Sequence, residues 1–331
     1  MKTLRRNPVR ERGVAVITAL LLTTLAISIV ASLFWQQQVQ VRTMENQRLQ
    51  LQTKWIQRGA LDWASLILQS SSGMQFTSVN QPWATPLAET RLDQYIERER
   101  VEGENFDATL SGNITDACAR YNLRNLAADD GSVDTKQRDM FQRLLSNLRI
   151  DTTLARRAAD YVVRGLPVTA PPEPPDNGGG TPPKPPERPR EVPGTPMRFV
   201  QVDDLLSVPG FTPLMVEQLR PFVTVLPSKT KVNVNTAPPE VLAAAVEGMS
   251  VSEGNALVVR RQQAEWRDVN NFGLAVGGRP VDQALVDVKS DWFLVNSRIR
   301  LDRAALDAES LVERRPQMTG GGVKVWWIRQ Y

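Results

Sequence analysis

The side chains that most often do chemistry in proteins are scarce in this sequence. It has no histidine and a single cysteine, Cys118, among 331 residues. Without imidazole there can be no Ser-His-Asp triad, no Cys-His dyad and no zinc site with histidine ligands. One cysteine also rules out an intramolecular disulfide bond, and neither common Gly-rich phosphate loop is present. Carboxylates are therefore the main groups left for catalysis or metal binding.

Three acidic residues, Asp129, Asp130 and Asp134, lie close together in a predicted loop. Their oxygen atoms suit a hard cation such as Ca²⁺. Their spacing is not that of an EF-hand loop, so a solvated turn is the favoured interpretation and a Ca²⁺ site is the alternative. No spaced pair of carboxylates stands out in a glycosidase-like context. We therefore predict that the chain is not an enzyme and assign it no definite cofactor.

The charge of the chain is unevenly distributed. The formal net charge is +4, but residues 1–13 hold five of the 40 Lys and Arg residues and one of the 36 Asp and Glu residues. The remaining chain carries 35 of each and is neutral. Nucleic-acid-binding proteins usually carry an excess of basic residues, so the apparent basicity indicates a targeting signal instead.

An apolar segment without charges, residues 14–35, follows this basic leader. As a helix of about 1.5 Å per residue it spans roughly 33 Å, enough to cross the hydrocarbon core of a bilayer. In a secretory signal the small residues of the cleavage site follow the apolar segment. Here Gly13 precedes it, so that cleavage after Gly13 would keep the apolar helix. An uncleaved anchor with positive-inside flanks is the simpler alternative.

This order of leader, glycine and apolar helix resembles the class-III leader of type IV pilins and type II secretion pseudopilins. The resemblance implies that a prepilin peptidase cleaves between Gly13 and Val14 and methylates the new N-terminus at Val14. Most pilins place Glu at the fifth mature position, where this chain has Thr18. A subunit without that carboxylate has no charge to neutralise on a subunit above it, so Thr18 favours a position at the fibre tip. Alternatively, Thr18 only bonds to its own helix.

The helical pattern continues beyond the membrane segment, because no Pro occurs between Pro8 and Pro82. We expect one helix from Val14 to about Gln69, with the segment that contains Val14, Thr18, Leu22 and Trp35 in the membrane and in assembly contacts. One predicted stripe of apolar residues packs the second half on a soluble domain. Its members are Met44, Leu51, Trp55, Trp63 and Ile67.

The middle of the chain has helical spacing, whereas its flanks alternate like strands. We expect a surface strand pair over 91–110, helices over 134–163 with Asp151 as an N-cap, and a helix that follows Thr236 as a cap. Residues 169–197 contain 11 of the 23 prolines and are predicted to be an extended or disordered loop. Strand-like runs close the chain at 292–301, 310–314 and 323–331.

Several motifs together resemble the K-type minor pseudopilins of type II secretion systems (general secretion pathway protein K). The most specific is Val-Asn-Val-Asn-Thr-Ala-Pro at 232–238, which contains Asn233, Asn235 and Thr236. The supporting motifs are Gln-Pro-Trp-Ala at 81–84, Tyr-Asn-Leu at 121–123 and the Leu-Leu-Ser-Val-Pro-Gly turn at 205–210, which ends in Pro209 and Gly210. The Pro-rich segment departs from the acidic, aromatic loop usual in the family.

The resemblance implies an α+β, pilin-like fold, in which a long N-terminal transmembrane helix packs on a small antiparallel sheet. An all-helical domain with helix-hairpin-helix or SAM-like units is inserted into that sheet. The expected divisions are a leader (1–13), a transmembrane half-helix (14–35), a first pilin-like part (36–112), the inserted domain (113–285) and a second pilin-like part (286–331).

A structural role is also implied by the resemblance. Such proteins form a tip complex with I- and J-type minor pseudopilins, below which the major pseudopilin assembles on the inner-membrane secretion platform. The expected location is the bacterial inner membrane, with a single pass and the bulk of the chain in the periplasm. No nucleic-acid partner is expected.

The strongest alternative is a membrane-anchored DNA-binding protein, because residues 232–261 have the outline of a helix-hairpin-helix. Such hairpins bind phosphate through a Gly-apolar-Gly turn. The turn at Gly248 lacks the second glycine, and Glu253 stands where a lysine would help. Arg260 and Arg261 are the residues on which DNA binding would depend.

Overall fold

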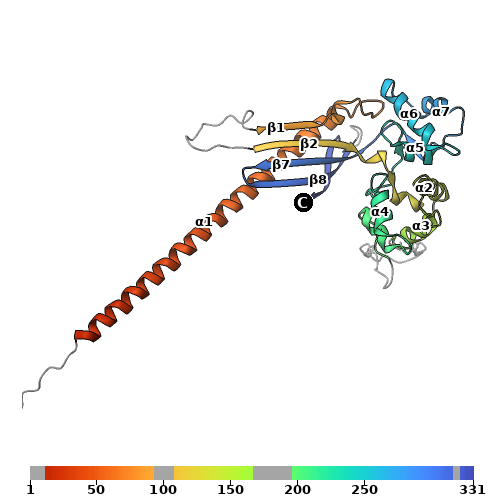
Figure 1. Ribbon diagram of the computed structural model, residues 1–331. Coiled ribbons are helices and arrows are strands. Elements are labelled where there is room, and N and C mark those ends of the chain that lie inside the picture. The colour runs from red at the N-terminus through yellow and green to blue at the C-terminus, as the bar shows by residue number, and fades with distance from the viewer. Residues whose placement is uncertain (1–11, 93–107, 167–195, 316–320) are drawn as a thin grey trace, which may run out of the picture.

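A single unbroken helix dominates the N-terminal part of the chain (Figure 1). The computed structural model describes residues 12–92, 108–166, 196–315 and 321–331. Helix α1 runs from Arg12 to Ser70, over 59 residues. No proline interrupts its backbone hydrogen bonds. The predicted continuous helix is therefore confirmed.

A five-stranded antiparallel sheet lies against the C-terminal half of α1. Its strand order is β1-β2-β7-β8-β9, so strands from the two ends of the soluble chain meet where β2 pairs with β7. The strands are β1 (Leu87–Arg91), β2 (Ala108–Asp116), β7 (Trp292–Leu301), β8 (Ala304–Arg315) and β9 (Gly322–Gln330). The long N-terminal helix on a small antiparallel sheet is the predicted fold. The strand pair expected over 91–110 is only partly tested. The observed pair, β1 with β2, overlaps that range at its two ends alone, and residues 93–107 lie outside the described residues.

The face of α1 that packs on the sheet is not the predicted apolar stripe. Met44, Leu51, Trp55 and Trp63 are exposed, Trp55 by 69%, and only Ile67 is partly buried against the sheet. The buried face carries instead Thr53, Gln57, Ala60, Leu61, Ala64 and Leu68. Small side chains let a helix approach a sheet closely, whereas a tryptophan holds it away. The stripe prediction was therefore wrong in its choice of face.

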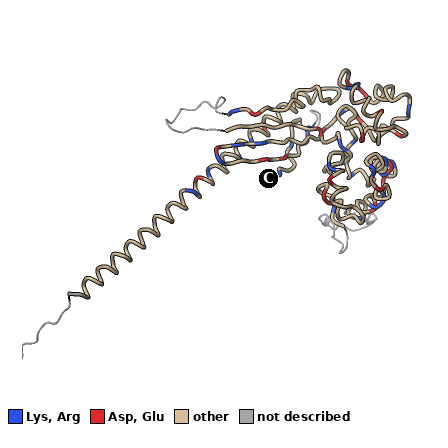
Figure 2. Tube along the Cα trace, in the orientation of Figure 1, with Lys and Arg blue, Asp and Glu red and all other residues tan. Residues whose placement is uncertain are grey.

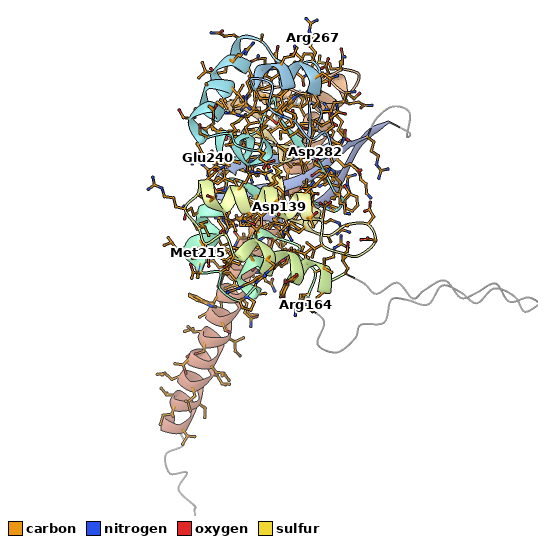
Figure 3. The ribbon with its side chains drawn as sticks, turned by 90° about the vertical axis from the view of Figure 1, so that its right-hand side faces the viewer. Asp139, Arg164, Met215, Glu240, Arg267 and Asp282 are labelled. Carbon is orange, nitrogen blue, oxygen red and sulfur yellow. The ribbon has the colours of Figure 1, made fainter. Side chains whose placement is uncertain are left out.

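The helical part follows β2 and precedes β7 along the chain. In space it lies at the end of the sheet remote from the membrane half of α1 (Figure 1). It contains α2 (Thr135–Asn147), α3 (Leu154–Arg164), α4 (Pro213–Leu219), α5 (Pro239–Ala245), α6 (Val251–Gln263) and α7 (Val269–Ala275). Short 3₁₀ turns are η1 (Pro82–Ala84), η3 (Ala117–Ala119), η4 (Leu123–Leu126) and η5 (Val202–Ser207). Figure 3 views the molecule from the right-hand side of Figure 1, with Arg267 at the top of the helical part and Arg164 of α3 at its bottom.

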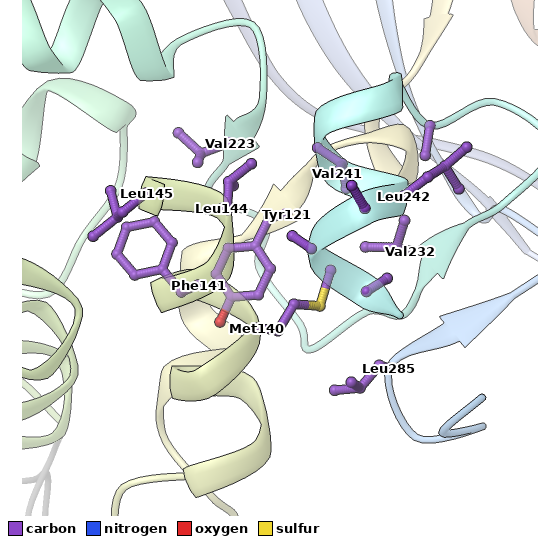
Figure 4. Close-up of a cluster of buried hydrophobic side chains, with 14 of the residues drawn as sticks. Tyr121, Met140, Phe141, Leu144, Leu145, Val223, Val232, Val241, Leu242 and Leu285 are labelled. Atoms are coloured by element: carbon purple, nitrogen blue, oxygen red, sulfur yellow. The ribbon is translucent and has the colours of Figure 1, made fainter. Parts of the chain in front are cut away.

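One apolar core holds all of these helices together. Tyr121 stacks on Phe141 with ring centroids 5.3 Å apart, and Leu144, Leu145 and Val241 close around them (Figure 4). The Tyr121 hydroxyl donates to the carbonyl of Gln137 at 3.0 Å, so this buried polar group is satisfied. The helical part thus has a core of its own, separate from that between α1 and the sheet.

Two local expectations are corrected. The helical part is not purely helical, because it contains two short parallel pairs, β3 (Tyr121–Asn122) with β4 (Val223–Thr224) and β5 (Val232–Asn233) with β6 (Val286–Asp287). The N-cap position of α3 is occupied by Thr153, whose backbone N–H and hydroxyl donate to Asp151. Asp151 therefore closes the turn before the helix and does not cap it.

The predicted division of the chain can be compared with these elements. The sheet ends at Asp116 of β2 and resumes at Trp292 of β7, so the boundary expected at 112 falls inside a strand. The division itself stays a prediction. The leader and nearly all of the Pro-rich segment, residues 1–11 and 167–195, lie outside the described residues.

Candidate assembly surface and domain junction

The N-terminal half of α1 contacts nothing else in the described chain. Between residues 12 and 42 the helix carries no charge (Figure 2). Val14, Leu22 and Trp35 are all exposed, Trp35 by 71%. In the described part of the chain this is the one helix long and apolar enough to cross a membrane, and none of its most apolar stretch is buried against the rest of the protein. Exposure of so large an apolar surface to water is unfavourable, so lipid, other helices or both must cover it.

The predicted processing site lies at the start of this helix. Gly13 and Val14 belong to the first turn of α1. The Thr18 hydroxyl donates to the carbonyl oxygens of Val14 and Ala15, each at 3.0 Å. Thr18 is therefore satisfied within its own helix and brings no charge into the apolar segment.

A buried polar cluster joins the helical part to the sheet and to α1. At its centre is Asp116, the last residue of β2. Its Oδ2 accepts hydrogen bonds from the Asn233 amide at 3.0 Å and from the hydroxyls of Thr236 and Ser290. Its Oδ1 accepts from the backbone N–H of Cys118 at 2.8 Å. We call this cluster, together with Thr77, Ser71 and Arg314, the junction.

Arg314 of β8 forms the other half of the junction. Its guanidinium donates to the hydroxyls of Ser71 and Thr77 at 2.9 and 2.8 Å and to the carbonyl of Ser290 at 2.7 Å. The guanidinium carbon also lies 4.8 Å from the centre of the Phe293 ring. These contacts bring together the end of α1, the loop that follows it and strand β8.

Burial sets the electrostatics of the junction. It raises the pKa of Asp116, and the hydrogen bonds from Ser290, Thr236 and Asn233 oppose that rise. It lowers the pKa of Arg314, with Asp291 and Asp116 opposing. Burial also raises the pKa of the Cys118 thiol. Cys118 is therefore an unreactive core residue.

The motif at 232–238 connects the junction to the rest of the helical part. Asn233 donates to Asp116 and also to the carbonyl of Thr77. Asn235 exchanges two hydrogen bonds with the backbone of Trp266, each at 2.9 Å. Thr236 was predicted to cap α5, but Pro238 occupies the N-cap position and the Thr236 hydroxyl donates to Asp116. The cap prediction was wrong because a residue that precedes a proline is disfavoured from helical conformation, so Pro238 stays extended and α5 begins only at Pro239.

The turn that ends in Pro209 and Gly210 positions α3. Gly210 has a φ of +105°, and a Cβ there would lie 2.8 Å from a methyl group of Leu154. The Arg157 guanidinium donates to the carbonyl of Pro209 at 3.2 Å. The glycine is thus required by its backbone conformation and by the close packing of the turn on α3.

The acidic loop residues do not converge on one point. Asp129 pairs with Lys229 at 2.7 Å. Asp130 accepts from the backbone and hydroxyl of Ser132, which lower its pKa. Asp134 caps α2 by accepting from the N–H of Gln137 at 3.0 Å. No group of three or more Asp, Glu, Cys or His residues gathers as a metal ion would require in the described ranges, and the alternative of a Ca²⁺ site stays untested.

The helix-hairpin-helix outline is present but does not present a phosphate site. At the N-terminus of α6, Glu253 accepts from Ser250 and pairs with Arg279 at 2.7 Å, and these contacts lower its pKa to about 2. A fixed negative charge there opposes a phosphate. Arg261 is buried and donates to the carbonyls of Val234 and Ala237. Arg261 therefore holds the 232–238 motif and cannot reach DNA.

Sequence reasoning missed most of the junction. Asp116, Ser290 and Arg314 were not singled out, although Asn233 and Thr236 were. A signal existed for Arg314, which is a charged residue on the inward-facing side of β8, two residues after the buried Val312. No local signal marks Asp116 or Ser290, because their contacts come from distant parts of the chain.

These features define a class of protein. A long helix, apolar in its first half and packed on a small antiparallel sheet in its second, is the architecture of a pilin-like subunit. The inserted helical part distinguishes this subunit from a simple pilin.

Comparison with known families makes the identification specific. Models of type II secretion system (T2SS) protein K match residues 119–228 and 232–293, together more than half of the chain. The chain belongs to the type II secretion system protein K family.

Relatives and solved structures agree with this assignment. Type II secretion system protein K of Dickeya chrysanthemi is 26% identical over 346 residues, covering 93% of this chain and 95% of the relative. The Klebsiella pneumoniae protein is 26% identical over 336 residues, with coverage of 94% and 95%. A chain of the GspK-GspI-GspJ complex from enterotoxigenic Escherichia coli matches with a TM-score of 0.63 and 19% identity, covering 88% of this chain and 99% of that one. The predicted fold and family are confirmed.

Proposed function

We propose that this chain is a minor pseudopilin that initiates assembly of the type II secretion pseudopilus from the fibre tip. The observation that carries the proposal is the division of α1 into an exposed apolar half and a half packed on the sheet. We call the apolar N-terminal half of α1 the rod and the folded remainder of the chain the head. Because α1 continues without a break from the rod into the head, the rod can enter a membrane and then stack against the rods of other subunits. Membership of the protein K family supports this role.

The membrane arrangement follows from the same helix. In the proposal, residues 14–35 cross the bacterial inner membrane once and the remaining chain lies in the periplasm. Prepilin peptidase cuts between Gly13 and Val14 and methylates Val14. Thr18 supplies no carboxylate for the N-terminal ammonium of a subunit above it, which suits the first subunit of a fibre.

The bulk of the head supports a tip position. The helical part extends from the end of the sheet remote from the rod (Figure 1). A subunit packed laterally in a fibre would have to accommodate that extension against its neighbours, whereas a tip subunit would not. By analogy with the E. coli GspK-GspI-GspJ complex, its partners at the tip would be I- and J-type minor pseudopilins. The major pseudopilin and the inner-membrane platform would act below.

This proposal assigns no catalytic activity and no nucleic-acid partner. The burial of Arg261 and the ion pair of Glu253 with Arg279 disfavour the DNA-binding alternative.

The test is mass spectrometry of the N-terminus in cells with and without prepilin peptidase. We expect N-methylated Val14 in the first strain and an uncleaved leader in the second. An end at Met1 in both strains, or a cut beyond Trp35, would refute the proposal. A Gly13→Leu variant provides a matched control, because it changes the cleavage site alone and should retain the leader in both strains.

A further inference from the structure

A polar cleft lies between the helical part and the face of the sheet opposite α1. Its volume is about 390 Å³, which is within the range of sites that hold small ligands or a few residues of peptide. The helical part contributes η5, β4 and the residues that flank them, and the sheet contributes β7, β8 and β9. The cleft is separate from the junction and shares none of its residues.

Three arginines line this cleft, and only one of them is satisfied. Arg220 binds both carboxylate oxygens of Asp203, at 2.6 and 3.3 Å. Arg120 forms no side-chain hydrogen bond or ion pair with the described part of the chain, and neither does Arg329, which lies 4.2 Å over the Trp327 ring. Two guanidinium groups therefore present free N–H donors to the cleft.

The surroundings of these two arginines restrict the ligand. Arg120 is largely withdrawn from solvent, and this burial lowers its pKa. Glu309, which lies opposite Arg329 in the β8–β9 pair, attracts Arg120 through space without forming an ion pair. Arg220 is paired with both Asp203 and Glu217. The other charged residues that line the cleft, Arg120, Arg329 and Glu309, together carry one net positive charge. Glu309 would repel a doubly charged phosphate more strongly than a singly charged carboxylate.

Apolar walls accompany the charges. Val200, Val202, Val223, Leu294 and Trp327 line the same cleft. A ligand that fits must combine apolar groups with a planar anion, for which the fork of an arginine is the natural partner. Acidic side chains that alternate with apolar ones on an extended peptide meet both requirements.

We propose that this cleft binds an extended peptide segment of a partner protein, with Arg120 and Arg329 holding an Asp or Glu carboxylate and the apolar walls receiving its neighbours. This inference goes beyond the tip role and does not depend on it. The cleft is on the sheet face that α1 leaves uncovered, so it stays accessible when α1 packs against other helices.

The test is isothermal titration of the full chain in detergent with a capped pentapeptide of alternating valine and glutamate. The matched peptide carries glutamine in place of glutamate, and inorganic phosphate is the third probe. We expect the glutamate peptide to bind and the glutamine peptide to bind roughly tenfold more weakly or not at all, because each replacement loses a charge-assisted contact.

Variants locate the site. Arg120→Gln and Arg329→Gln should each weaken binding of the glutamate peptide by roughly tenfold, without loss of folding, since neither side chain forms a hydrogen bond within the described part of the unbound chain. Glu309→Gln should strengthen binding several-fold by removing a repulsive charge. Arg298→Gln is the control, because Arg298 is exposed on the same sheet and pairs with Asp307, and it should change nothing.

The proposal is wrong if the two peptides bind equally, if neither binds at millimolar concentration, or if both arginine variants bind as well as the unaltered chain. Phosphate binding as tightly as the glutamate peptide would indicate a general anion site and would also overturn it. Failure here would leave the N-terminal processing result unaffected.

Discussion

The core of the helical part and the junction that attaches it to the sheet are both buried, yet they are held together differently. Phe141, Leu144 and Leu145 are fully buried in an apolar core. The junction instead surrounds Asp116 and Arg314 with amides and hydroxyls. Apolar burial is non-directional, whereas hydrogen bonds require a defined distance and angle. The core therefore stabilises the helical part, and the junction fixes its orientation relative to the rod.

The largest effect is expected in the core. Phe141→Ala removes a ring that stacks on Tyr121, and truncation of a buried Phe typically costs about 3–5 kcal/mol. Urea unfolding of the full chain in detergent should show the helical signal lost at a lower midpoint. An unchanged midpoint would mean that this core does not stabilise the domain. Phe34→Ala, in the membrane half of α1, is the control and should leave that midpoint in place.

A variant of the junction should lose less stability than Phe141→Ala, but the helical part should become less fixed in its orientation relative to α1. Asp116→Asn replaces a carboxylate that accepts four hydrogen bonds with an amide, whose NH2 group is a donor and cannot accept from the groups that face it. The expected cost is about 1.5–3 kcal/mol. Spin labels placed at exposed Arg58 and Arg267 report the distribution of distances between α1 and the helical part. This distribution should broaden in Asp116→Asn and stay narrow in Phe141→Ala at urea concentrations below its unfolding midpoint. Buried Cys118 should not react with the label. Equal broadening in both variants would contradict the division of roles.

A smaller effect is expected at the turn against α3. Gly210→Ala places a Cβ at φ +105° and close to Leu154, which should cost on the order of 1 kcal/mol or slightly more. Thermal unfolding would measure the loss. Gly131→Ala is a matched control, since Gly131 also has a positive φ of +80° but a Cβ added there would meet no atom within 4 Å. If the two variants lose the same stability, the packing on α3 contributes nothing.

The smallest effect concerns pH. Because the folded chain raises the pKa of Asp116, it binds a proton more readily than the unfolded chain does. The contribution of this group to stability should therefore be full below its ordinary pKa of 3.8 and fall as the pH rises towards the folded pKa. Four hydrogen bonds oppose the shift, so the change should be small. Other carboxylates, among them Glu253, have lowered pKa values and stabilise the fold as the pH rises, so the quantity to measure is the difference in urea midpoint between the unaltered chain and Asp116→Asn. That difference should shrink from about pH 3 to 7, and its growth over that interval would reverse the predicted sign.

How much could be predicted from the sequence differs between these regions. The periodicity predicted α1 and the strand β7 with its observed bounds, because each is a local pattern. The motif at 232–238 was recognised, but its partner Asp116 was not, since pairing of β2 with β7 brings the two together from distant parts of the chain. The buried face of α1 was missed because Ala60 and Ala64 pack well while carrying little hydrophobicity.

The central claim is that a rod and an oriented head together make a tip subunit. The most direct measurement is co-purification of the full chain from membranes with I- and J-type minor pseudopilins, compared for the unaltered chain and Asp116→Asn. We predict a ternary complex with the unaltered chain and a weakened one with the variant. Recovery of the unaltered chain without either partner would contradict the account.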